Sequence, residues 1–189
     1  MTFRKLWPWE WAQHRAHLLR LAPDDRRLRF CRSVSDDLIH RYCDQIDRSQ
    51  TTLAGYFVSG TLRGVAELVR FPEGVPVSAE IALSVERPFQ EQGIGGKLLE
   101  MSLLVARNRF IDTVHMISLQ ENDVIQHLAR KFGAKIGAYG VTAEARIRLP
   151  APSYLSLMDE ITGDNQALIS AVFEPPVEQM MAAAALDLQ

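Results

Sequence analysis

The chain has 189 residues, of which 47% are hydrophobic and 23% are charged, as is typical of a globular protein with one domain of ordinary size. Its formal net charge of −2 provides no general attraction to nucleic acid or to an anionic membrane, so neither is expected as a partner. No apolar run is long enough to span a membrane, and no signal-peptide core follows residues 1–6. We therefore expect a cytoplasmic protein.

The first fifty residues are predicted to be mostly helical. Residues 2–6 can form a short strand, and three helical segments follow at residues 9–21, 23–32 and 35–46. Ser35 precedes the last segment and is a candidate N-cap. These segments carry no recognisable substrate code.

A β-hairpin is predicted next. Branched and aromatic residues at positions 53–58 and 62–71 flank Ser59-Gly60, a dipeptide that favours a tight hairpin turn. A third strand is expected at residues 77–85. Three consecutive strands therefore occupy the middle of the chain.

A glycine-rich loop joins the strand at residues 80–85 to a predicted helix at residues 95–108. The loop spans residues 90–97, and three of the four residues 93–96 are glycine. Glycines expose the backbone N–H groups where a helix begins, and the helix dipole adds positive charge at that end. The loop therefore predicts a site for the phosphates of a cofactor.

Two common phosphate loops do not fit this sequence. A Rossmann fingerprint requires a third glycine at the position of Leu98. A Walker A loop requires glycine at Glu91 and Ser or Thr at Leu98. The alternatives left are another phosphate-binding family and a glycine-rich turn without a ligand.

The rest of the chain changes in composition near Pro150. A strand at residues 113–119 and a helix at 123–132 are followed by two strands, at residues 134–139 and 141–149. Beyond Pro150 the chain contains acidic residues but no Lys or Arg. We expect a domain boundary there.

The acidic segment is predicted to contain two short amphipathic helices, at residues 153–161 and 164–173, broken at Gly163. It can cover part of the core, form a homodimer contact or attract a basic substrate. The sequence leaves these three roles open.

Two separated motifs resemble the GCN5-related N-acetyltransferase (GNAT) family. Residues 90–95 have the pattern Gln-x-x-Gly-x-Gly of its pyrophosphate loop, and Asn122, Leu128 and Gly133 have the offsets of its second motif. Residues 27–30, Arg-Leu-Arg-Phe, also resemble a segment of bacterial protein-lysine acetyltransferases. The resemblance implies a mixed α/β fold with a GNAT domain at residues 1–149 and an extension at 150–189.

In that family, the strands corresponding to residues 80–85 and 113–119 splay apart, and the pantetheine arm lies between them. The implied activity is direct transfer of an acetyl group from acetyl-CoA, the co-substrate, to a primary amine of a protein lysine or a small molecule. The alternative is a CoA-binding sensor or interaction module with little or no activity. The implied cofactor-binding residues are Leu83, Ser84, Val85, Gln90, Glu91, Gln92, Gly93, Ile94, Gly95, Gly96, Lys97 and Asn122.

Glu80 is the first candidate for the general base. An amine of the lysine type has a reference pKa of about 10.4, so a proton must be removed before it can attack. Glu80 lies thirteen residues before Gly93, in a segment that resembles the one carrying the base in protein-lysine members. Glu67 on the neighbouring strand is the reserve base. Their ordinary roles would be a surface glutamate and a cross-strand ion pair.

The general acid is not identified by the sequence. Ala129 stands where many family members carry the tyrosine that protonates the departing thiolate. Water, Ser118 or Tyr139 can replace it, and none is favoured. The thioester carbonyl can be polarised by the backbone N–H of Val85 or Leu83.

No metal site is expected. His14 and His17 are three residues apart on a predicted helix, but no third ligand accompanies them at a supporting spacing. Cys31 and Cys43 form no metal-binding or disulfide pattern.

Overall fold

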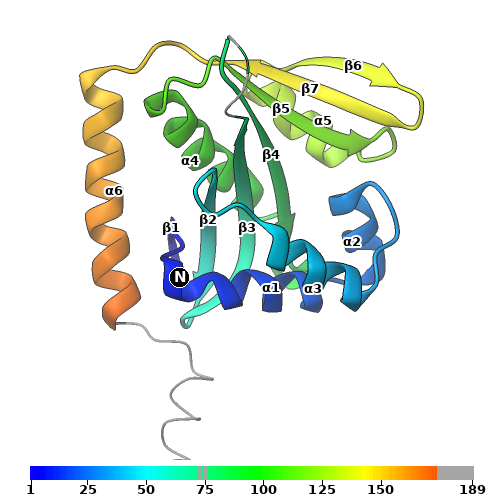
Figure 1. The fold of residues 1–189 in the computed structure, drawn as a ribbon, viewed down its shortest axis with the longest axis horizontal. Helices are drawn as coiled ribbons and strands as arrows, with labels where there is room; N and C mark the ends of the chain where they lie inside the picture. The colour runs from blue at the N-terminus through cyan, green and yellow to red at the C-terminus, as the bar shows by residue number, and fades with distance from the viewer. Residues whose placement is uncertain (72–73, 75, 174–189) are drawn as a thin grey trace, which may run out of the picture.

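The computed structural model describes residues 1–71, 74 and 76–173. In this part of the chain, seven strands form one mixed sheet in the order β1-β2-β3-β4-β5-β7-β6 (Figure 1). The strands are β1 (Thr2–Lys5), β2 (Thr51–Val58), β3 (Thr61–Phe71), β4 (Ser78–Val85), β5 (Thr113–Leu119), β6 (Lys135–Tyr139) and β7 (Thr142–Arg148). The helices are α1 (Trp11–Arg20), α2 (Pro23–Phe30), α3 (Asp36–Gln45), α4 (Ile94–Asn108), α5 (Asp123–Lys131) and α6 (Tyr154–Phe173). The expected mixed α/β fold is confirmed.

The predicted hairpin joins β2 to β3. Ser59 and Gly60 both have positive φ, 49° and 72°, as a type I′ turn requires, and this turn matches the right-handed twist of the strands. Strands β1 to β4 then pair antiparallel, each with the next. They form a continuous platform.

Helices cover the two faces of this platform differently. The apolar face packs against α4 through side chains such as Leu68, Ile81 and Leu98, which are buried in one core cluster, while α5 covers β5, β6 and β7. Burial of each such side chain contributes roughly 1.5–3 kcal/mol. The opposite face lies under α1, α2 and α3 and holds several buried polar side chains (Figure 1). The candidate acid–base side chains therefore lie on that second face.

The sheet opens between β4 and β5. These parallel strands pair only through Ser78–Glu80 against Thr113–His115, so residues 81–85 of β4 have no partner on β5. β5 instead pairs along its whole length with β7, and the two halves of the sheet diverge (Figure 1). The predicted splay of these strands is confirmed.

The first predicted helix is divided in two. A 3-10 turn at Pro8–Glu10 precedes α1, because the Glu10 carboxylate accepts a hydrogen bond from the Trp7 backbone N–H and forms a buried pair with Arg4. The predicted cap of α3 is confirmed, since the Ser35 side chain accepts from the Leu38 N–H at 3.3 Å. Of the helices that the structure describes, none combines the length and apolar character needed to cross a membrane.

The two helices predicted on either side of Gly163 are wrong, because α6 continues through that residue. A glycine inside a helix costs only about 1 kcal/mol, and contacts on both sides of it offset that cost. The Lys5 ammonium donates to Glu160 at 2.5 Å and to Asp164 at 2.8 Å. α6 therefore lies along β1 and the end of α4 (Figure 1). Residues 174–189 lie outside the described part of the chain.

Candidate functional site

The glycine-rich loop leads from the end of β4 into α4. Gly93 is the N-cap of α4 and has a φ of 78°, a conformation that favours glycine. No side chain caps this helix, so its first backbone N–H groups are left without a side-chain acceptor. A Cβ atom added to Gly93 would meet no atom within 4 Å. The start of α4 is therefore an open surface suited to an anion.

Two glutamines hold the loop in shape. The Gln90 side chain donates to the Val85 carbonyl at 2.8 Å, and the Gln92 side chain donates to the Pro88 carbonyl at 3.1 Å. Glu91 between them has a φ of 61° and is exposed. The side chains of this segment thus turn back to their own backbone, and its amides remain available to a ligand.

The remaining residues of the loop lie against α5. A Cβ atom on Gly95 or Gly96 would be 3.6 or 3.7 Å from a methyl group of Leu128, an ordinary contact distance. Ile94 is buried in the core, and the exposed Lys97 donates to Glu100 at 2.8 Å. The predicted loop residues therefore lie together at one end of α4.

Asn122 lies on the other side of the gap, directly after β5. Its side-chain oxygen accepts from the Ile125 N–H at 3.3 Å and so caps α5, which is a common role for an asparagine at the start of a helix. About two turns further along α5, Ala129 is 1% exposed and packs in the core. The position of the expected tyrosine is thus filled by a small buried side chain.

Glu67 is buried in a polar network beneath α1, α2 and α3. Its carboxylate accepts from the Arg29 guanidinium and from the Tyr42 hydroxyl, both at 2.7 Å. His14 Nε2 lies 3.7 Å from it, and burial, followed by the nearby charge of Arg29, lowers the pKa of His14 to about 3. A neutral His14 therefore leaves Arg29 as the cation that balances Glu67.

Glu80 occupies the point where β4 and β5 part. It pairs in register with His115, the last such pair before the gap, and lies on the same face of the sheet as Glu67. Burial raises the pKa of Glu80, as does the charge of Glu67, while the charges of Arg29 and His115 act in the opposite direction. Glu80 is thus a half-buried carboxylate with increased proton affinity.

A second buried network was missed by the sequence reasoning. His17 Nε2 is 2.9 Å from the Ser84 hydroxyl, and His17 Nδ1 is 3.1 Å from the Glu86 carboxylate. Burial lowers the pKa of His17, so the neutral ring accepts from Ser84 and donates to Glu86. The sequence feature that could have indicated this network is the spacing of His14, His17 and Arg20, which places them on one face of α1. Arg20 also donates to Glu86.

This second network changes the interpretation of Ser84. Its hydroxyl connects β4 to α1, whereas its neighbours Leu83 and Val85 are half-buried against the apolar core.

In the described residues, no group of three or more His, Cys, Asp or Glu side chains is placed to hold a metal ion.

Comparison with known families identifies the class of protein that has this loop and gap. The model of the acetyltransferase (GNAT) family matches residues 3–134. The chain therefore belongs to the GNAT acetyltransferase family, and it is an acetyl-CoA-dependent N-acetyltransferase. No curated protein matches the chain.

Solved structures share the fold at low sequence identity. The GNAT domain of PAT from S. lividans has a TM-score of 0.66 at 18% identity, covering 78% of this chain and 89% of that one. The putative acetyltransferase yncA from Salmonella typhimurium, solved with acetyl-CoA, has a TM-score of 0.59 at 17% identity, covering 82% and 98%. The ribosomal-protein-S18-alanine N-acetyltransferase from Escherichia coli has a TM-score of 0.61 at 13% identity, covering 81% and 96%.

Proposed function

We propose that acetyl-CoA binds in the gap between β4 and β5, with its pyrophosphate at the start of α4. The observation that carries this proposal is the parting of the two strands directly before a helix whose first amides have no side-chain cap. The amides of residues 92–96 would hold the pyrophosphate, with the Lys97 side chain adding positive charge because the Lys97 N–H already donates to the Gly93 carbonyl at 3.1 Å. The edge of β4 at Leu83 and Val85 would pair with the pantetheine arm. Asn122 would bond to that arm from the opposite wall.

Glu80 acts as the general base in this proposal. Bound acetyl-CoA supplies the acetyl group as a thioester, whose thiolate leaves as the amine nitrogen attacks. Glu80 accepts the proton that the amine must lose, and its raised pKa makes it a stronger base than an ordinary carboxylate. A backbone N–H of Leu83 or Val85 donates to the carbonyl oxygen as negative charge develops there.

Glu67 tunes this base rather than replacing it. Its carboxylate is 1% exposed and already accepts from Arg29 and Tyr42, so it has little access to an acceptor amine. Its negative charge lies on the same face as Glu80 and raises the proton affinity of that residue. We therefore assign the reserve base a positioning role.

One observation favours a different function, that of a CoA-binding sensor with little turnover. Ala129 offers no proton to a departing thiolate, because its side chain is a methyl group buried in the core. The two functions differ in one measurement, because a sensor binds acetyl-CoA but shows no turnover that depends on Glu80.

The acceptor in this proposal is a primary amine, either of a protein lysine or of a small molecule.

We further propose a cytoplasmic enzyme that can form a homodimer through α6. Tyr154 and Leu155 on this helix are 74% and 72% exposed, which supports a contact with a second copy. Light scattering of the wild type and a Leu155→Glu variant tests the dimer, since the variant should be monomeric.

Calorimetric titration of acetyl-CoA into the wild type and a Gly95→Glu variant tests the cofactor site. The glutamate places negative charge beside the uncapped amides, while its Cβ meets Leu128 only at an ordinary distance, so the helix should still form. We expect micromolar binding, at about −8 kcal/mol, to be lost in the variant. ATP and NAD are the control ligands, and tighter binding of either would contradict the proposal.

A further inference from the structure

A pocket lined by three arginines lies far from the glycine loop. Arg48 follows α3, Arg70 lies near the end of β3, and Arg109 directly follows α4. The pocket has a volume of about 300 Å³. Because Arg109 and the glycine loop lie at opposite ends of the 15-residue helix α4, the two sites are separated by about 22 Å.

The three guanidinium groups have no ionic partner among the described residues. Other arginines, such as Arg4 and Arg29, make ion pairs in this part of the chain, but Arg48, Arg70 and Arg109 make none. Among the residues that the structure describes, no Asp or Glu lines the pocket. Cations gathered without an acidic neighbour repel one another, and a bound anion would remove that repulsion.

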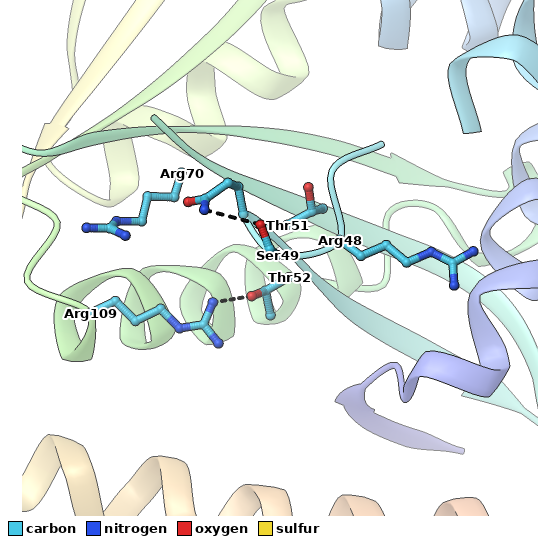
Figure 2. A pocket seen from close by; sticks show the side chains of 7 residues that line it. Arg48, Ser49, Thr51, Thr52, Arg70 and Arg109 are labelled. Atoms are coloured by element: carbon cyan, nitrogen blue, oxygen red, sulfur yellow. Dashed lines mark hydrogen bonds between the residues drawn. The ribbon is translucent and has the colours of Figure 1, made fainter. Parts of the chain in front are cut away.

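The walls of the pocket are held by the backbone and by hydroxyl groups. The Arg70 backbone N–H donates to the Gln50 carbonyl at 2.9 Å, which ties the end of β3 to the loop before β2. The Arg109 guanidinium donates to the Thr52 hydroxyl, whose own proton is then free for a ligand (Figure 2). Figure 2 shows Arg70 and Arg109 on one side of the pocket and Arg48 extending to the other side. The Arg48 guanidinium points away from the other two and lies over the Trp11 ring, 5.0 Å from its centroid. The positive charge available to a ligand is therefore concentrated at Arg70 and Arg109.

Two buried polar atoms in the pocket lack a partner. Arg70 Nε is a donor without an acceptor, and the Gln50 side-chain oxygen is an acceptor without a donor, among the residues that the structure describes. An unpaired buried polar group is unfavourable, so each favours a ligand that can complete it. An oxygen of an anion can complete the first, and a donor such as a hydroxyl group can complete the second.

We propose that this pocket is a second binding site, for a small polyanion that carries phosphate or carboxylate groups and at least one hydroxyl group. The anionic groups would contact Arg70 and Arg109, with Arg48 contributing positive charge at longer range, and the hydroxyl group would donate to Gln50. This proposal goes beyond the acetyltransferase site and does not depend on acetyl-CoA binding.

Calorimetry with three probes tests the site. Citrate carries three carboxylates and a hydroxyl group, tricarballylate is the same molecule without the hydroxyl group, and inorganic pyrophosphate represents phosphate. We expect citrate to bind the wild-type full chain at one site. Pyrophosphate should also bind this pocket in the Gly95→Glu variant, where the glycine loop is blocked. Binding should weaken about tenfold or more in Arg70→Gln and in Arg109→Gln, because a charged hydrogen-bond donor is lost. Citrate should bind more tightly than tricarballylate.

Two control variants separate this pocket from the rest of the molecule. Gly95→Glu blocks the glycine loop and should retain anion binding, while Arg41→Gln removes an exposed arginine of α3 outside the pocket and should also retain it. Arg109 is exposed at the end of its helix, so its variant should fold normally, as circular dichroism can check. Absence of binding to the wild type would overturn the proposal, as would loss of binding in Gly95→Glu or in Arg41→Gln. Equal affinity for citrate and tricarballylate would remove the hydroxyl group from the ligand class.

Discussion

The two parts of the sheet that border the gap differ in how they are built. β1 to β4 are covered on both faces by helices, and residues 53–57 of β2 are all buried. β5, β7 and β6 are covered mainly on one face, and β6 is exposed or half-buried along its whole length. Among the described strands, only three paired residues of β4 and β5 join the two parts of the sheet. The base thus lies on the more rigid wall of the gap, and the second wall has less buried area to hold it in place.

Each part of the sheet contains an Arg–Glu ion pair, but the two pairs differ in how much they affect stability. Arg29 and Glu67 pair in the interior of the first part, where both side chains are less than 10% exposed. Arg146 and Glu144 pair at the surface of the second part, where Arg146 is 53% exposed. A buried ion pair is costly to break from one side, whereas an exposed pair is screened by water.

The largest expected effect is a loss of folding stability when Arg29 is replaced by methionine. Arg29→Met leaves the Glu67 charge buried with only the Tyr42 hydroxyl and the neutral His14 ring beside it, and we expect a loss of about 3–5 kcal/mol in the free energy of unfolding. Arg146→Met is the matched control and should change stability little. Urea unfolding measures both, and equal losses would show that the two parts do not differ in this way.

Glu80→Gln should have the next largest effect, on catalysis. Removal of a general base typically lowers turnover by about 100-fold or more, while acetyl-CoA affinity should stay unchanged because the side chain contacts the amine. Glu144→Gln, on the other wall of the gap, is the control and should retain most activity. Wild-type turnover in Glu80→Gln would remove this residue from the mechanism, whereas acetyl-CoA binding without turnover in the wild type would favour the sensor.

The pH dependence of turnover sharpens the same prediction. Glu80 must be ionised to accept a proton, and burial together with Glu67 raises its pKa, so kcat/KM should fall as the pH decreases through a value above that of an ordinary carboxyl group. Glu67→Gln removes a neighbouring negative charge and should move this fall to lower pH. A profile unchanged in Glu67→Gln would contradict the tuning role.

Much of this site was predictable from sequence because it depends on local features. The glycines of residues 93–96 and the hairpin at Ser59-Gly60 have backbone requirements that few other residues meet, so the loop and the turn were predicted in place. Glu80 was found by resemblance to a family segment. The strand order that opens the sheet was also implied by that resemblance, not by periodicity.

What the sequence did not predict depends on contacts between distant segments. Arg29 lies 38 residues before Glu67, and His17 lies 67 residues before Ser84, so neither network has a local pattern. Gly163 gave a local signal that was misleading, because Lys5 contacts α6 on both sides of that glycine. The tertiary contacts outweighed the local preference there.

His14 should make stability depend on pH in the first part of the sheet. Burial lowers its pKa from 6.5 to about 3 in the folded protein, so between these values the unfolded chain binds a proton that the folded chain does not. Stability should therefore fall as the pH decreases from 6.5 toward 3, by up to about 1.4 kcal/mol per pH unit. His14→Gln should reduce this slope in urea unfolding at pH 7, 6 and 5, and identical slopes would contradict the prediction.

Asn122 gives the smallest expected effect and tests the second wall of the gap. Asn122→Ala removes the cap of α5 and should cost about 1 kcal/mol, as Ser35→Ala should at α3 in the first part. Asn122→Ser retains a capping oxygen and should preserve stability, yet it loses the amide that we assign to the pantetheine arm. Weaker acetyl-CoA binding in both Asn122 variants, with stability lost only in the alanine variant, would separate the two roles. If the serine variant binds acetyl-CoA as the wild type does, Asn122 is a helix cap alone, and the pantetheine arm is held from the β4 wall.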